Sequence, residues 1–189
     1  MPLRRLTLLA LAALPLAACS GDIVRYPSAP VANTDRVRIP HATVEVAEVT
    51  LPTYAAVEEI YIQDATGALT ASNDLLWADE PSRAVTLTLV RNLSEITGAR
   101  IAPGPWPYEQ LADARLEVNV EEMVARTTGS FHISGQYVVA AEAGLGRDRS
   151  GFFDITVPLV ADPDARAIAA ARAAAVSQLA GEIARNGLR

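Results

Sequence analysis

The clearest structural signal in the chain is the segment Ala114-Arg115-Leu116-Glu117-Val118-Asn119-Val120-Glu121. Apolar and polar residues alternate along it, which is the pattern of a β-strand with one buried face and one solvent-facing side. Residues 131–139 and 153–159 show a similar alternation, and the segments 127–129 and 144–151 have the composition of hairpin turns. Three long consecutive strands joined by short turns predict an antiparallel meander.

Shorter strands are predicted before this meander. Residues 43–51 alternate with one slip, with valines and a leucine on one side and glutamates on the other, until Pro52 ends the pattern. Residues 59–63 and 69–71 form two further short strands, joined by the turn sequence Asp64-Ala65-Thr66-Gly67.

Two helices are predicted from apolar stripes at helical spacing. The first begins with Asp79 as N-cap and Pro81 in the first turn, and ends at Gly98. Its buried stripe is Val85, Leu89, Leu93 and Ile96.

The second helix is rich in alanine and closes the chain. Asp162 is its predicted N-cap, Pro163 its first residue, and Gly187 its end. Its buried stripe is Ile168, Ala171, Ala175, Leu179 and Ile183. Together, the elements predict an α+β fold: a mostly antiparallel sheet of about six strands with two helices packed on one face, in a single domain of residues 42–189.

The N-terminus has the layout of a secretory signal peptide over residues 1–18. Arg4 and Arg5 precede an apolar run that is too short to span a bilayer comfortably. The run ends in Leu16-Ala17-Ala18-Cys19, which resembles a bacterial lipobox and contains the only cysteine of the chain. The resemblance implies that Cys19 becomes the lipid anchor, carrying a diacylglycerol on its thiol. The alternative is that Cys19 is a small apolar residue of an uncleaved anchor, or a free thiol.

Residues 19–41 are expected to form the lipidated N-terminus and a flexible tether, because prolines interrupt every regular pattern there. Ser20 follows the cysteine, and in lipoproteins of the enterobacterial type this residue permits sorting to the outer membrane. We therefore expect a domain on the periplasmic face of the outer membrane. Several acyl chains anchor a protein stably, whereas one chain binds only marginally.

Composition excludes some function classes. The chain of 189 residues has a net charge of −6, and without Arg4 and Arg5 it carries −8. An acidic chain without basic clusters is a poor candidate for binding nucleic acid. With its one cysteine lipidated, the mature domain has no disulfide, so its stability must come from core packing.

The sequence shows no convincing catalytic set. His41 and His132 are isolated histidines, a type that is far more often structural or solvated than catalytic. Glu121 and Glu122 are neighbours in a strand and point to opposite faces. No Cys/His/Asp spacing resembles a metal site, and no glycine-rich loop has the lysine of a phosphate loop. We expect a protein without metal, cofactor or enzyme activity.

Short motifs carry a family resemblance over nearly the whole mature chain. A lipobox and a tether precede Val49-Thr50-Leu51-Pro52-Thr53-Tyr54, and Trp77-Ala78-Asp79-Glu80-Pro81 opens the first helix. This combination resembles the ABC-type transport auxiliary lipoproteins, most closely the PqiC-like branch. Two departures are Leu76, where a basic residue is expected before the tryptophan, and Asp79, which is inserted before Glu80 and Pro81.

The resemblance implies a non-catalytic accessory role at the outer membrane. Such lipoproteins accompany MCE-domain proteins that move lipids between the inner and outer membranes, and self-association into a homo-oligomer is compatible with this role. The alternative is a structural lipoprotein that assists assembly of another envelope complex, for secretion or lipopolysaccharide export.

Four aromatic residues are the candidates for partner binding: Tyr54, Trp77, Trp106 and Tyr108. Exposed aromatic pairs mark partner sites, which favours the proline-rich loop that contains Trp106 and Tyr108. Each residue also has a structural interpretation. Trp77 would cover the start of the first helix, Tyr54 would end an edge strand, and the loop of Trp106 would fold back over the sheet.

Overall fold

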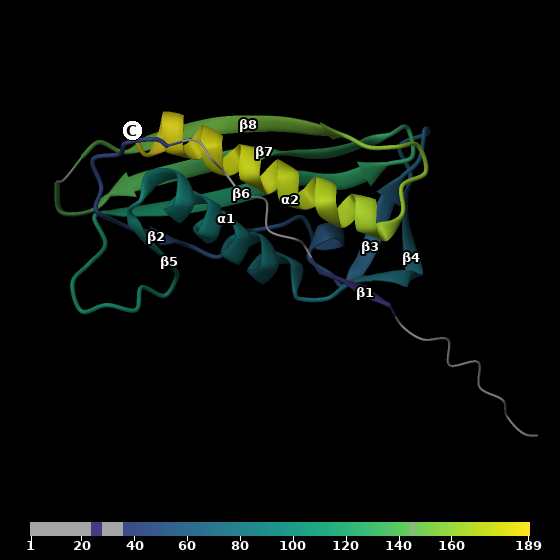
Figure 1. The fold of residues 1–189 in the computed structure, drawn as a ribbon, viewed down its shortest axis with the longest axis horizontal. Helices are drawn as coiled ribbons and strands as arrows, with labels where there is room; N and C mark the ends of the chain where they lie inside the picture. Colours follow the sequence, from purple (N-terminus) through teal and green to yellow (C-terminus); the bar gives the residue numbers. More distant parts are fainter. Residues whose placement is uncertain (1–23, 28–35, 145) are drawn as a thin grey trace, which may run out of the picture.

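One long strand, β6 (Ala114–Arg126), is the central strand of the sheet in the computed structural model (Figure 1). The structure describes residues 24–27, 36–144 and 146–189, without the side chains of 72–74 and 143. The predicted signal peptide and Cys19 lie outside the described residues. The predicted meander is confirmed: β7 (Ser130–Ala141) pairs antiparallel with β6, and β8 (Arg149–Pro158) pairs antiparallel with β7.

The other edge of β6 is covered by two short strands that lie end to end. β2 (Thr43–Val46) pairs with the start of β6, and β3 (Glu59–Gln63) pairs with its end, both in parallel. A bridge between Thr50 and Asn119 fills the interval, and a 3-10 turn, η1 (Thr53–Ala55), leads into β3.

Three more strands extend the two ends of the sheet. β4 (Leu69–Trp77) pairs antiparallel with β3, β5 (Arg100–Pro103) pairs parallel with β2, and β1 (Arg25–Tyr26) pairs parallel with the end of β4. The described part of the chain thus forms a sheet of eight strands. The expectation of about six mostly antiparallel strands is wrong, because four of the seven pairings are parallel. Alternation shows which residues of a strand are buried, but it does not specify the neighbouring strand or its direction.

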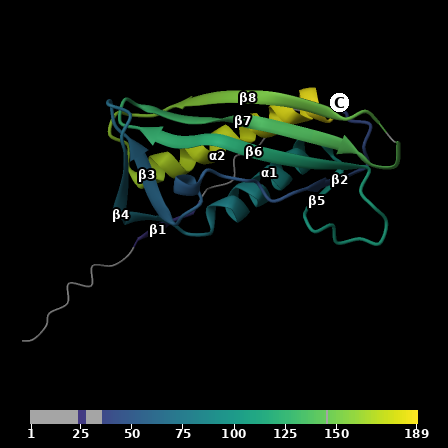
Figure 2. The same ribbon diagram turned by 180° about the vertical axis from the view of Figure 1, so that it is seen from behind.

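Both predicted helices are confirmed, and they cover the same face of the sheet (Figures 1 and 2). α1 (Pro81–Thr97) ends at Gly98, whose φ of 70° is the left-handed conformation that glycine adopts readily. α2 (Ala165–Glu182) continues into a π-helical turn, η3 (Ile183–Gly187). All residues of both predicted stripes are buried.

The N-caps differ from the predicted ones. The Glu80 carboxylate, and not that of Asp79, accepts hydrogen bonds from the amides of Ser82 and Arg83, at 2.9 and 2.7 Å. At the second helix Asp164, and not Asp162, accepts from the amide of Ala167 at 2.7 Å. In both cases the cap lies one or two residues later than the sequence pattern indicated.

The core lies between the helices and the inner face of the sheet. The large apolar side chains of α1, such as Leu89, Leu93 and Ile96, are fully buried there, and each contributes about 1.5–3 kcal/mol. α2 contributes mostly alanines, with Ala175 and Ala180 also fully buried. Because alanine has only a β-carbon, these positions let α2 approach its neighbours closely.

Part of the predicted tether belongs to the folded domain. Arg25 and Tyr26 form β1, and the Val37 amide donates to the carbonyl of Ile96 at 2.9 Å. His41 is 6% exposed, and burial lowers its pKa, an effect that Asp113 opposes. The folded domain therefore begins before residue 42.

The backbone of β6 leaves no room for a side chain on β7 where the register of the two strands shifts between Val120 and Glu122. Gly135 pairs with Val120 at this point. A β-carbon at Gly135 would clash with the backbone oxygen of Asn119, lie 2.9 Å from the α-carbon of Val120 and lie 3.0 Å from the ring of Phe153. Only glycine fits without displacing backbone.

We predict that Gly135→Ala lowers the free energy of unfolding by about 3 kcal/mol, because two central strands must separate to admit the methyl group. Chemical denaturation measures the change. The control is Gln136→Ala at the neighbouring exposed position, which should change stability by less than about 0.5 kcal/mol. Equal stability of Gly135→Ala and the wild-type protein would contradict the described strand contact.

Candidate partner-binding surfaces

The loop between β5 and β6 contains two of the predicted aromatics. Its fold is held by the Trp106 indole, whose Nε1–H donates to the carbonyl of Gln110 at 2.7 Å. The rings of Trp106 and Tyr108 meet edge to face with centroids 5.0 Å apart, and the guanidinium carbon of Arg100 lies 5.4 Å from the centre of the Tyr108 ring. These contacts give the loop a defined shape.

This loop projects from one end of the sheet and does not fold back over it (Figure 1). Tyr108 is 49% exposed and Leu111 is 75% exposed, whereas Trp106 is half-buried. Because the chain enters the domain through β1 at the opposite end, the loop and β1 lie far apart along the long axis (Figures 1 and 2).

Trp77 is placed in the core. It is 5% exposed, and the guanidinium carbon of Arg172 lies 3.6 Å from its ring centre. Burial lowers the pKa of Arg172 to about 10, with the charge of Asp79 opposing the shift, so Arg172 remains charged at neutral pH. Such a cation over a desolvated indole stabilises the packing of α2 on the end of β4.

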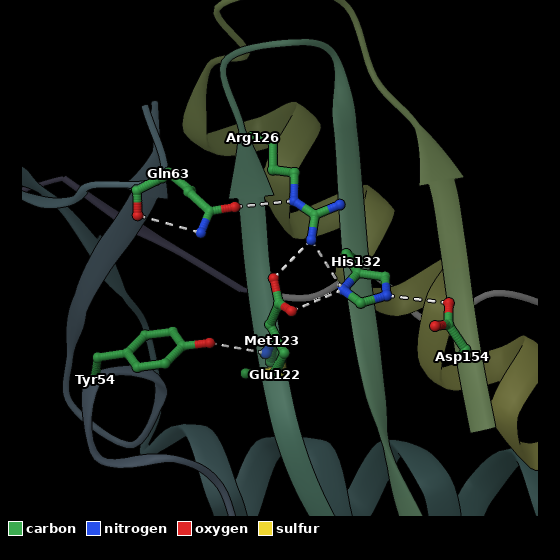
Figure 3. A network of polar contacts seen from close by, with 8 residues as sticks. Tyr54, Gln63, Glu122, Met123, Arg126, His132 and Asp154 are labelled. Atoms are coloured by element: carbon green, nitrogen blue, oxygen red, sulfur yellow. Dashed lines mark hydrogen bonds and ion pairs between the residues drawn. The ribbon is translucent and has the colours of Figure 1, made fainter. Parts of the chain in front are cut away.

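The Tyr54 hydroxyl is a side-chain hydrogen-bond partner for the backbone of β6. Beyond the register shift, the Met123 amide donates to the Tyr54 hydroxyl at 3.1 Å (Figure 3). Burial raises the pKa of this hydroxyl, and its ring meets Tyr61 edge to face at 6.0 Å. Tyr54 and Trp77 both line a cavity of about 10 Å³, which is too small for more than one water molecule.

A polar cluster on the outer face of the sheet was not expected from the sequence (Figure 3). The Glu122 carboxylate pairs with Arg126 at 2.7 Å and with His132 Nδ1 at 3.3 Å, and His132 Nε2 lies 3.1 Å from Asp154. Arg126 also donates to Gln63 at 3.0 Å. The cluster ties β3, β6, β7 and β8 together.

The residues of this cluster form ion pairs and hydrogen bonds with each other across four strands, which indicates that they stabilise the sheet. In the part of the chain that the structure describes, no group of three or more His, Cys, Asp or Glu side chains is arranged to hold a metal ion. The cluster could have been sought by asking which outward positions of adjacent strands pair. His132 pairs with Val124, which lies between the cluster residues Glu122 and Arg126 on β6. The register shift before Glu122 changes which residues of β6 face outward, so simple alternation does not predict that these side chains meet.

Apart from the β5–β6 loop, the outer face of the sheet has exposed apolar side chains on β7 and β8. Phe152 is 76% exposed, and Val138 on β7 is 37% exposed. Within the described residues, no helix is long and apolar enough to cross a membrane.

Comparison with known proteins gives one family match and several structural ones. The family model described as ABC-type transport auxiliary lipoprotein component matches residues 27–184. No curated protein sequence matches significantly.

Two crystal structures resemble this fold over most of their length. One, of an uncharacterized protein, has a TM-score of 0.69 and 23% identity, and the match covers 85% of this chain and 95% of that chain. The other, of a DUF330 protein from Xanthomonas campestris, has a TM-score of 0.63 and 18% identity, covering 85% and 92%. Because both identities are below 25%, these matches show that the fold is shared and nothing further.

We predict that Tyr54→Phe lowers the free energy of unfolding by about 1–3 kcal/mol, because it leaves the Met123 amide without its hydroxyl partner. Tyr61→Phe is the matched control, since the described residues show no hydrogen bond from the Tyr61 hydroxyl. Thermal or denaturant unfolding of both variants measures the difference. If the two variants were equally stable, the Tyr54 hydroxyl would have no structural role.

Proposed function

This chain belongs to the ABC-type transport auxiliary lipoprotein family, and we propose that it is the membrane-anchored, non-catalytic docking subunit of an intermembrane lipid transport system. The family supplies the accessory role in transport and the lipoprotein character. The finer proposal is that Cys19 anchors the domain to the outer membrane and that its periplasmic partner is an MCE-domain protein.

The observation that carries this proposal is the position of the β5–β6 loop. Its exposed Tyr108 and Leu111 lie at the opposite end of the domain from β1, through which the chain leads back toward Cys19 (Figures 1 and 2). An anchor at one end leaves the loop at the end of the domain that lies far from the anchor (Figure 1). A periplasmic partner could reach it there without displacing the domain.

The chemistry of the loop suits protein recognition. Tyrosine and tryptophan dominate interface hot spots because each offers a large, rigid contact area at a small entropic cost. The Trp106–Gln110 hydrogen bond and the Arg100–Tyr108 contact hold the aromatic rings in place before binding. A preorganised surface loses less conformational entropy when a partner binds.

We predict that the double variant Tyr108→Ala/Leu111→Ala recovers at least about tenfold less MCE-domain protein in pull-downs from solubilised membranes, equivalent to about 1.4 kcal/mol of binding. Both side chains are exposed and lie outside the core, so the stability of the domain should change by no more than about 1.5 kcal/mol, the loss of the Trp106–Tyr108 ring contact. Trp106→Ala should also weaken recovery without unfolding the domain.

Phe152→Ala is the matched control, because it removes an even more exposed aromatic side chain from a different surface. It should leave recovery unchanged. The docking role would be contradicted if the wild-type protein recovered no MCE-domain protein, or if the loop variant recovered as much as the wild type. Recovery of secretion or lipopolysaccharide-export components instead would favour the structural alternative.

For the anchor, we predict that Cys19→Ala yields unprocessed or soluble protein, because the thiol that receives the lipid is missing. Mass spectrometry of the N-terminus and membrane fractionation measure the outcome. A Cys19→Ala protein that still fractionates as mature protein with the outer membrane would show that Cys19 is not the anchor.

A further inference from the structure

β1 is a two-residue strand at the end of the domain that lies far from the aromatic loop. It pairs with the last two residues of β4, and the Ala78 amide donates to the Tyr26 carbonyl at 3.2 Å. The Arg25 guanidinium pairs with Glu58 at 2.8 Å and donates to the Trp77 carbonyl at 3.1 Å. These contacts fix the chain to this end of the domain.

The position of β1 limits how far this end can lie from the membrane. Five Cα–Cα steps separate Cys19 from Val24, and even a fully extended chain spans at most about 18 Å over that length. If β1 did not dock, the next described residue held to the domain would be Arg36, whose guanidinium donates to the carbonyl of Glu95, and the reach from Cys19 to it would be about 61 Å. Docked β1 therefore keeps its end of the domain beside the bilayer.

A groove of about 400 Å³ lies between β1 and α2 at this end. Its walls are mostly apolar, with Val24, Tyr26 and Ala169 among the lining residues. Arg25 and Arg166 also line it. Arg25 is held by Glu58, whereas Arg166 is exposed and, in the described part of the chain, has no ion pair.

We propose that the β1–α2 groove faces the bilayer and contacts phospholipids, with Arg166 at the headgroup phosphates. The proposal rests on anchoring through Cys19 in the proposed function. It follows from the short distance to the anchor and from Arg166, the arginine without an ion pair among the described residues that line this apolar groove. Arginine binds phosphate through parallel N–H donors, and its stem packs on apolar surface.

Fluorescence quenching of the lipidated full-length protein in vesicles tests this proposal. Because lipidation occupies the thiol of Cys19, Ala170→Cys introduces a unique thiol for a fluorophore at an exposed lining position of the groove. In vesicles of phosphatidylethanolamine and phosphatidylglycerol that contain headgroup spin-labelled lipid, we expect this label to lose at least half of its fluorescence. The same label at Leu111→Cys, in the distant loop, should lose less than about a tenth.

Equal quenching at both positions, or none at position 170 in protein that sediments with the vesicles, would overturn the groove proposal and leave the docking role intact. Protein that does not sediment would instead overturn the anchor. Adding Arg166→Glu should reduce the quenching at position 170 at least twofold, whereas Arg91→Glu, a charge reversal at an exposed arginine of α1, should not. No effect of Arg166→Glu would also count against the role of Arg166.

Discussion

The pairing of one edge of β6 is the constraint on which the rest of the structure depends. Backbone amides and carbonyls buried in a sheet must find partners, and this edge receives them from three separate segments. β2 covers its start, the Thr50 bridge its middle, and β3 its end. Where none of these reaches, beyond the register shift, the Tyr54 hydroxyl accepts from Met123. Pro52 and the turn η1 therefore place the Tyr54 hydroxyl where it can bond to the edge of β6.

The two faces of the sheet are stabilised in different ways. The inner face is covered by α1 with large apolar side chains and by α2 with alanines, so close packing provides its stability. The outer face has no covering layer in the described structure, and the half-buried cluster around His132 connects its strands. Such pairs at a partly exposed surface contribute modestly, so the inner face dominates the stability of the domain.

Local patterns predicted the elements well, and long-range partners poorly. Alternation located β6, β7 and β8, and helical spacing located the buried stripes of α1 and α2, because both patterns reflect burial on one side of an element. The parallel pairing of β2 and β3 with β6 leaves no trace in alternation, which is the same for either direction. Capping chemistry could not separate Asp79 from Glu80, since either carboxylate can accept amide hydrogens at a helix start. The proline-rich composition favoured the loop of Tyr108 as a surface site, whereas the burial of Trp77 under Arg172 of α2 depends on a long-range contact that no local pattern shows.

The separation of the two ends of the domain gives the proposed function its geometry. β1 holds the chain at one end, and the aromatic loop projects from the other (Figures 1 and 2). Because the sheet and its helices form one packed unit between these ends, the proposed anchor at one end would restrict where the loop at the other end can lie. A flexible tether alone would let the loop sample all directions, and binding would then cost orientational entropy. The few hydrogen bonds of β1 reduce that cost before any partner arrives. In the proposed arrangement, the short strand at the membrane end would contribute to docking at the far end without contacting the partner.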